Sequence, residues 1–253
     1  MSSATKPLFV VIGSTGAQGL GVCHSLLADG KYRVRALTRN PVSERAKALS
    51  EAGAEVVKSA FNGAEALYLV TDAWDELNRG NCQVEAEQGI TLVNCAVESG
   101  IKQIFFSNGP TFQHDIPMIR VCVLDADNDV GPVVVGILNA KNPEHYAGKP
   151  IVISSEDLTF PQMAEIYSKD GNYDYITPEW TEMAKDMCED DYISARTYYS
   201  LAKRLPGHHL EPAKELAGAG SLTTFETWLR KTGFNVFDPV WRAKFSSAPW
   251  NGY

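Results

Sequence analysis

The sequence constrains its fold most strongly near the N-terminus, where an apolar run, a glycine-rich turn and an amphipathic stretch follow one another. Leu8–Gly13 reads LFVVIG, a continuous apolar run typical of a strand that is buried on both faces. Gly13, Gly16 and Gly19 follow at the spacing GxxGxxG. Gln18–Asp29 then carries apolar residues at helical spacing. This order predicts a strand, a tight turn and a helix packed on a sheet.

The three glycines suit a turn that binds phosphate. Gly13 lets the chain turn sharply out of the strand, and Gly16 removes a side chain where the backbone must approach a pyrophosphate. Gly19 lets the helix pack closely on the sheet. The helix N-terminus presents unpaired N–H groups and the positive end of the helix dipole. We therefore predict a dinucleotide-binding βαβ unit; a glycine-rich turn that binds nothing is the alternative.

The end of the second predicted strand distinguishes between the two nicotinamide cofactors. Units that bind NAD usually place Asp or Glu about 20 residues past the glycines, where the carboxylate binds the ribose 2′-hydroxyl. Here that position is Arg39, preceded by Thr38, and no carboxylate is near. A guanidinium pairs well with the 2′-phosphate of NADP. The sequence thus favours NADP(H), with an arginine on a surface turn as the alternative.

Strands and helices continue to alternate through the first half of the chain. Apolar runs predict strands, and stretches with helical periodicity separate them. Asn40-Pro41 is expected to be the N-cap and first residue of a helix that runs to about Ala52. This pattern predicts an α/β fold with a doubly wound parallel sheet. The predicted elements are strands at Tyr32–Arg39, Glu55–Lys58, Ala66–Val70 and Gln103–Ser107, and a long helix at Asn81–Ser99.

Polar residues follow the fourth and fifth strands at the edge where such sheets bind ligands. Thr71-Asp72 follows the fourth strand, and Ser107-Asn108 ends the fifth. Trp74 lies close by in sequence and is a candidate wall of a nicotinamide pocket. A solvated loop is the alternative for each.

One connection is too short for the predicted sheet. Only the segment Ser59–Glu65 separates the third strand from the fourth, whereas a parallel crossover needs a dozen or more residues. Either these two strands are not parallel neighbours, or a piece the size of a helix is missing.

The second half of the chain is less regular. Val130–Leu138 fits either a strand or a buried helix. Thr159-Phe-Pro-Gln162 resembles a capping box for a helix to about Ser168, and Thr223-Thr-Phe-Glu226 another, for a helix that ends at Gly233. Further expected elements are a strand at Pro150–Ser154 and helices at Glu179–Cys188 and Tyr192–Leu205.

Composition excludes several classes of function. The formal net charge of −8 disfavours direct binding of nucleic acid or an anionic membrane surface. The most apolar long stretch, Val121–Leu138, is broken by acidic residues and cannot cross a bilayer. Five widely spaced cysteines without a CxxC indicate reduced thiols rather than disulfides or a metal site. We expect a cytoplasmic protein without a metal, or a nuclear one if it is regulatory.

Several segments resemble the NmrA-like family of atypical short-chain dehydrogenase/reductases. They are GSTGAQG in the glycine turn, VRALTRNP, GAEVVK and LVTDAW, followed later by IPMIRV, DVGPVVVGIL, YAGKPIVIS and TFETWLRKTGF. The resemblance implies a Rossmann domain that binds NADP(H), and a smaller C-terminal α/β domain that closes a cleft over the nicotinamide. The cofactor residues it implies are Gly13, Thr15, Gly16, Ala17, Gln18, Gly19, Thr38, Arg39, Thr71 and Ser107.

The chain departs from the family's pattern in two places. After Lys58 it lacks the family's acidic loop and helix, and after Asn108 it lacks roughly sixty residues, including a lysine that members use near the nicotinamide. We expect a Rossmann domain at residues 1–115, with internal segments missing near residues 59–60 and 109–114. Residues 116–253 would complete the sheet and form the smaller domain. If the native protein contains these segments, its intact mass will lie well above 27.7 kDa.

No catalytic residue can be named from the residues present. Tyr199 and Lys203 match the Tyr-x-x-x-Lys spacing of short-chain reductases, but they lie too far along the chain, and His208-His209 lacks a third metal ligand. Some family members reduce small molecules, and others act as sensors of the NADP(H) state. We expect a redox-state sensor that acts through regulatory protein partners. The alternative is an NADPH-dependent reductase of a small-molecule carbonyl, quinone, imine or enone; a homodimer is left open in both.

Overall fold

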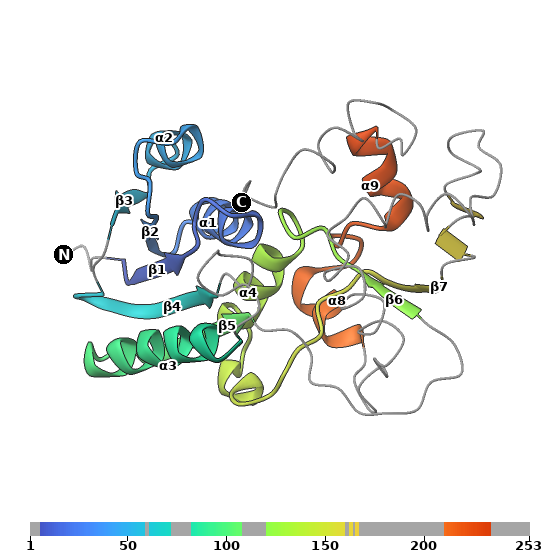
Figure 1. The fold of residues 1–253 in the computed structure, drawn as a ribbon. Helices are drawn as coiled ribbons and strands as arrows, with labels where there is room; N and C mark the ends of the chain where they lie inside the picture. The colour runs from blue at the N-terminus through green and yellow to red at the C-terminus, as the bar shows by residue number, and fades with distance from the viewer. Residues whose placement is uncertain are drawn as a thin grey trace, which may run out of the picture.

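The computed structural model describes residues 6–58, 61–71, 82–107, 120–159, 162–163, 165–166 and 210–233. Five parallel strands form its main sheet, in the order β3-β2-β1-β4-β5 (Figure 1). The order reverses between β1 and β4, as in a doubly wound Rossmann-like sheet, which confirms the predicted fold class. The strands are β1 (Leu8–Ile12), β2 (Arg33–Leu37), β3 (Glu55–Val57), β4 (Ala64–Val70) and β5 (Gln103–Ser107).

Helices cover both faces of this sheet. On one face α1 (Ala17–Asp29), α2 (Glu44–Glu51) and α4 (Val130–Leu138) contribute to a core with alternate residues of β1, β2 and β4. On the other face α3 (Cys82–Glu98) packs against the remaining residues of β1 and β4. Strands buried on both faces explain why their sequences read as continuous apolar runs.

The start of α2 differs from the prediction. The N-cap is Ser43, whose hydroxyl accepts a hydrogen bond from the backbone N–H of Ala46 at 3.3 Å. Asn40 instead closes a turn ahead of the helix, because its side-chain oxygen accepts from Val42 N–H at 3.3 Å and its carbonyl accepts from Ser43 N–H at 3.3 Å. Pro41 therefore lies in this turn and not at the first helical position.

The short connection between the third and fourth strands links strands that are not neighbours. β2 and β1 lie between β3 and β4, so the two strands are not neighbours; the missing segment expected near residues 59–60 stays a prediction. Phe61 packs into the second core, and the carbonyl of Asn62 accepts a hydrogen bond from Arg35 at 3.0 Å. Arg35 also pairs with Glu55 on β3 at 2.9 Å. On this face β2 and β3 thus carry a charged pair, of which Glu55 is exposed and Arg35 is largely covered.

The second half contains a small two-stranded sheet and two further helices. β6 (Arg120–Val123) and β7 (Glu156–Thr159) are antiparallel. α8 (Glu211–Ala217) packs on α4, and α9 (Phe225–Thr232) ends at Gly233 in the left-handed conformation, as predicted. A short 3-10 helix, η1, spans Pro143–Tyr146. None of the described helices has the length and apolarity needed to span a membrane.

The predictions for this half are only partly met. Val130–Leu138 is a helix and not a strand, the two possibilities that the sequence left open. Pro150–Ser154 is not a strand; its apolar side chains Ile151 and Ile153 pack beside residues of α4 and α8 instead of joining a sheet. The helix predicted from Thr159 falls largely outside the described residues, although residues 162–163 and 165–166 are helical. The helices predicted at Glu179–Cys188 and Tyr192–Leu205 lie outside the described residues.

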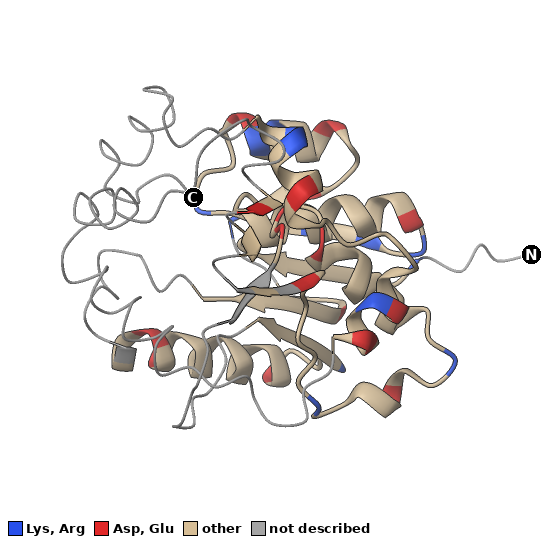
Figure 2. Cartoon of the chain, turned by 90° about the vertical axis from the view of Figure 1, so that its right-hand side faces the viewer, with Lys and Arg blue, Asp and Glu red and all other residues tan. Residues whose placement is uncertain are grey.

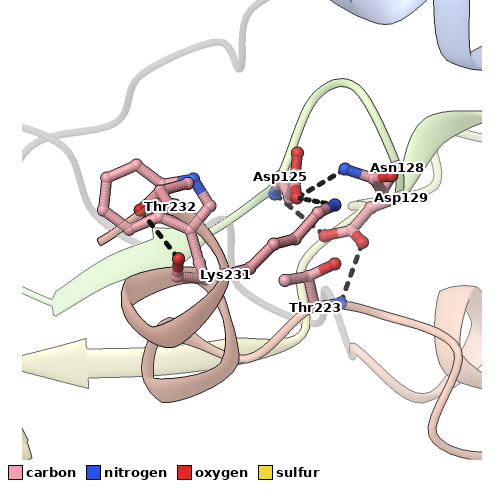
Figure 3. Close-up of polar contacts among 7 residues, drawn as sticks. Asp125, Asn128, Asp129, Thr223, Lys231 and Thr232 are labelled. Carbon is pink, nitrogen blue, oxygen red and sulfur yellow. Dashed lines mark hydrogen bonds and ion pairs between the residues drawn. The ribbon is translucent and has the colours of Figure 1, made fainter. Parts of the chain in front are cut away.

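A buried carboxylate fastens α9 to the loop before α4 (Figure 3). Asp129 is fully buried and accepts hydrogen bonds from the backbone N–H groups of Asp125 at 2.9 Å and Thr223 at 2.8 Å. Lys231 of α9 lies 3.7 Å from the carboxylate of Asp125. The N-cap of α9 is Thr224, one residue later than predicted, and its hydroxyl accepts from Thr227 N–H at 3.1 Å.

Candidate functional site

The glycine loop leaves β1 and enters α1 as the sequence predicts. Gly13 has a φ of +69°, and a Cβ at this position would lie 2.8 Å from Cγ1 of Val70. The N–H of Gly16 donates to the carbonyl of Gly13 at 2.9 Å, which closes the turn. Gly16 is the N-cap of α1, with no side-chain cap and no acidic residue in the first turn. The helix N-terminus, which begins with Ala17, therefore offers its first N–H groups and positive dipole end to an anion.

Gly19 allows α1 to approach the loop very closely. A Cβ at Gly19 would lie 2.2 Å from the carbonyl oxygen of Gly13 and 3.0 Å from the Cα of Ser14. No side chain larger than hydrogen fits there unless α1 moves away from the loop. This observation gives the predicted packing role of Gly19 a direct geometric cause.

Polar contacts fasten the loop to the end of β2. Ser14 is fully buried, and its hydroxyl donates to the carbonyl of Leu37 at 2.8 Å. The hydroxyls of Thr15 and Thr38 lie 3.2 Å apart. Thr38 also accepts from the N–H of Asn40 at 3.2 Å. These contacts hold the glycine loop and the β2–α2 turn side by side.

Two arginines belong to this corner of the structure. Arg39 follows Thr38 and is exposed. Arg45, in the first turn of α2, donates through Nη1 to the carbonyl of Thr15 at 2.9 Å. Arg45 was not predicted, because a basic residue in the first turn of α2 has no distinctive sequence signal until that helix is placed against the loop.

Gln18 connects α1 to the two strands on the other side of β1. Its side-chain oxygen accepts from the hydroxyl of Tyr68 on β4 and from that of Ser107 on β5, both at 2.7 Å. Tyr68 is only 2% exposed, and burial raises its pKa to about 12. The predicted residues Gln18 and Ser107 are therefore brought together beneath the edge of the sheet, around a tyrosine that sequence analysis did not single out.

Thr71 lies at the predicted edge, directly after β4. Its hydroxyl donates to the carboxylate of Glu85 in the first turn of α3 at 2.6 Å. Such a short distance is typical of a hydrogen bond to a charged acceptor. Glu85 was not predicted, since the pairing depends on how α3 packs. Asp72, Trp74 and Asn108 lie outside the described residues, as do Tyr199, Lys203 and the two histidines.

Together these residues form the edge of the sheet from β2 to β5, with the glycine loop at its centre. The arrangement fits a dinucleotide: a close backbone turn and a bare helix N-terminus for the pyrophosphate, and guanidinium groups on the β2 side. The hydroxyls of Thr71 and Ser107 lie on the β4–β5 side. Within the described part of the chain, no group of three or more His, Cys, Asp or Glu side chains is arranged to hold a metal ion.

Lys and Arg positions lie among Asp and Glu positions along the described ribbon in the view of Figure 2. The basic groups at the β2 end of the site are therefore a local feature of an acidic protein, which carries a net charge of −8. A local positive corner of this kind favours a small phosphorylated ligand over an extended polyanion.

Comparison with known proteins agrees with the geometry. Residues 5–117 match the model of the NmrA-like family. The NmrA-like family domain-containing oxidoreductase FrzB of Cladobotryum sp is 38% identical over 114 residues, or 41% of this chain and 34% of that protein. An NmrA-like family domain-containing protein of Dictyostelium discoideum is 36% identical over 112 residues, or 40% of this chain and 35% of that protein. The matched part of the chain thus spans about a third of the length of these relatives.

Solved structures show the same fold over a larger part of the chain. A crystal structure of NmrA, a negative transcriptional regulator, in complex with NAD has a TM-score of 0.69 at 15% identity, and the match covers 91% of this chain and 99% of that one. A second NmrA structure, in complex with NADP, has a TM-score of 0.63 at 16% identity and covers 98% of this chain and 99% of that one.

Three observations therefore converge: the strand order, the glycine loop that the sequence predicted, and the match over residues 5–117. Residues 5–117 of this chain are therefore similar in sequence to the NmrA-like family, and the described fold is the one seen in the solved NmrA structures.

Proposed function

We propose that this protein binds NADP(H) across the edge of its main sheet. The observation that carries the proposal is the corner formed by the glycine loop and α2, where Arg45 reaches the carbonyl of Thr15 and Arg39 follows Thr38. The adenosine ribose of a dinucleotide lies at this end of a Rossmann sheet. Guanidinium groups there pair with a 2′-phosphate and gain little from a 2′-hydroxyl.

The test compares NADP+ and NAD+ by calorimetric titration of the wild type, Arg39→Ala and Arg45→Ala. We expect the wild type to prefer NADP+ and each substitution to lower that preference about tenfold, the scale of one lost charge-assisted hydrogen bond. Lys47→Ala, another exposed cation on α2, is the matched control and should leave the preference unchanged. An unchanged ratio in both arginine variants would remove the basis for NADP(H) selectivity.

For the role of the bound cofactor, we propose a sensor of the NADP(H) state that acts through a regulatory protein partner. The similar NmrA structures are those of a negative transcriptional regulator, which supports this proposal.

A second candidate is an NADPH-dependent reductase of a small carbonyl, quinone, imine or enone. Its support is that matched relatives, including FrzB of Cladobotryum sp, are named oxidoreductases. Bound NADPH would supply a hydride, while the glycine loop would hold its pyrophosphate and Thr71 and Ser107 would line the nicotinamide end.

The two candidates are separated by following NADPH absorbance with a panel of quinones, imines and enones. A sensor should bind NADPH and NADP+ with different affinities and consume no NADPH. Turnover at the rates of ordinary reductases would exclude a pure sensor.

A further inference from the structure

The contact between Thr71 and Glu85 fixes the direction of a hydrogen bond at the β4 end of the site. A carboxylate has only acceptor positions, so the proton in the 2.6 Å contact must come from the Thr71 hydroxyl. The hydroxyl has one proton and two lone pairs. Because the hydroxyl proton is engaged in the hydrogen bond to Glu85, the Thr71 oxygen can act only as an acceptor toward a ligand.

The position of this acceptor is set by the packing of α3. Gly89 is buried one turn after Glu85, and a Cβ on Gly89 would lie 3.5 Å from Cγ2 of Thr71 and 3.7 Å from Cζ of Phe106. The first turn of α3 is thus held against the residue that follows β4. The Thr71 methyl group faces the helix, and its hydroxyl is within reach of Glu85 in the turn before.

The neighbouring edge hydroxyl is oriented in the same way. Ser107 donates its proton to the side-chain oxygen of Gln18 at 2.7 Å, and Tyr68 donates to the same oxygen. The described hydroxyls of β4 and β5 therefore direct their protons into the protein. On this side of the site, these hydroxyl oxygens therefore offer a ligand only their lone pairs.

A ligand that suits this edge must present N–H or O–H donors. In a dinucleotide that crosses the switch point, with its adenosine over β2, the nicotinamide half lies over β4 and β5. Its carboxamide carries an NH2 group with two donors. We propose that Glu85 is a positioning residue for the cofactor: it accepts the hydrogen bond that the Thr71 hydroxyl donates, so that the Thr71 oxygen accepts a hydrogen bond from the nicotinamide carboxamide.

This inference rests on the proposed NADP(H) binding, and three probes separate the two. Adenosine 2′,5′-bisphosphate contains the adenosine end alone. The 3-acetylpyridine analogue of NADP+ replaces the carboxamide NH2 with a methyl group and keeps the rest. Calorimetric affinities for these two compounds and for NADP+ are compared in the wild type, Glu85→Ala and Thr71→Val.

We expect the wild type to bind NADP+ about tenfold more tightly than the acetylpyridine analogue, the scale of one hydrogen bond whose loss leaves an acceptor unpaired. Glu85→Ala and Thr71→Val should each abolish that preference while leaving the affinity for adenosine 2′,5′-bisphosphate unchanged. Thr71→Ser keeps the hydroxyl and should restore the preference. In the double variant the loss should not increase, because both residues act through one bond.

Glu87→Ala is the matched control, because Glu87 lies half a turn from Glu85, is exposed and accepts from Gln83 at 3.1 Å. It removes the same charge and should keep the wild-type preference. The affinity for adenosine 2′,5′-bisphosphate shows that each variant is folded, and Thr71→Val, which is close in shape, tests the inference even if Glu85→Ala is unstable.

Three results would overturn the inference while leaving NADP(H) binding intact. They are a wild type without preference for NADP+ over its analogue, a Glu85→Ala variant that keeps the preference, and a parallel loss of all three affinities in both variants. A wild type that binds none of the probes would instead refute the proposed cofactor, and this inference with it.

Discussion

Replacing Gly19 with alanine tests the closeness of α1 to the glycine loop. The new Cβ would lie 2.2 Å from the Gly13 carbonyl oxygen and 2.6 Å from the Gly13 carbonyl carbon. Both are backbone atoms, so no side chain can rotate away, and the loop must move from the helix. Since Gly13 and Gly16 form the proposed pyrophosphate turn, the movement should weaken dinucleotide binding as well as stability.

The size of the effect follows from two opposing contributions. Overpacking a buried site typically costs about 1–3 kcal/mol, and a clash with backbone belongs at the upper end. Alanine in a helix gains up to about 1 kcal/mol over glycine. We therefore expect Gly19→Ala to lower the free energy of unfolding by about 2 kcal/mol.

Gly21 provides a matched control on the same helix. A Cβ there would lie 2.2 Å from a backbone carbonyl oxygen too, but that of Asp127 in the loop before α4. Gly21→Ala should therefore cost as much stability as Gly19→Ala while leaving the glycine loop in place. Urea unfolding measures the first quantity, and fluorescence titration with NADPH measures the second.

Two outcomes would refute this reasoning. If Gly19→Ala is as stable as the wild type and binds NADPH equally well, α1 and the loop are not in the contact described. If Gly21→Ala loses as much NADPH affinity as Gly19→Ala, the loss reflects general destabilisation and not the shape of the loop.

Three further predictions concern stability. Asp129→Ala leaves two backbone N–H groups without their acceptor, so it should lower the free energy of unfolding by about 2–4 kcal/mol and speed hydrogen exchange in α9; exchange at the wild-type rate would contradict the role of this carboxylate. Ser43→Ala should cost about 1 kcal/mol in urea unfolding by removing the α2 cap, and Asn40→Ala less; the reverse order would restore Asn40 as the cap. Burial raises the pKa of Tyr68 from 10 to about 12, so its contribution to stability is complete below pH 10 and is lost as pH rises toward 12. Tyr68→Phe should flatten that alkaline decline, and a decline as steep as in the wild type would show that the phenol is not its source.

Much of the site could be predicted because its signals are local. Gly13 and Gly19 are required by backbone geometry within a single turn, and that geometry is what the structure shows. Arg45 and Glu85 could not be found in the same way. Each acquires its contact only when a helix is placed against a loop or strand distant in sequence, so no spacing along the chain marks it.

The same distinction between local signals and tertiary contacts applies to secondary structure. Leu8–Ile12 is a strand because a continuous apolar run suits positions that are buried on both faces. Pro150–Ser154 has a similar composition but no strand pairing, since its isoleucines fill space beside α4 and α8. An apolar run predicts that its residues are buried, but it does not predict which elements they pack against.

The sequence by itself determined the βαβ unit, the alternation of elements and the resemblance to the NmrA-like family, because all three depend on short-range patterns of glycine and apolar residues. The tertiary structure decided that β3 and β4 are separated by two strands, and that Arg35 of β2 pairs with Glu55 of β3. It also decided the direction of the hydrogen bonds at the edge of the sheet, from Thr71 to Glu85 and from Ser107 to Gln18. A hydroxyl in a sequence is both donor and acceptor, and only the partner brought to it by packing determines which of the two remains for a ligand.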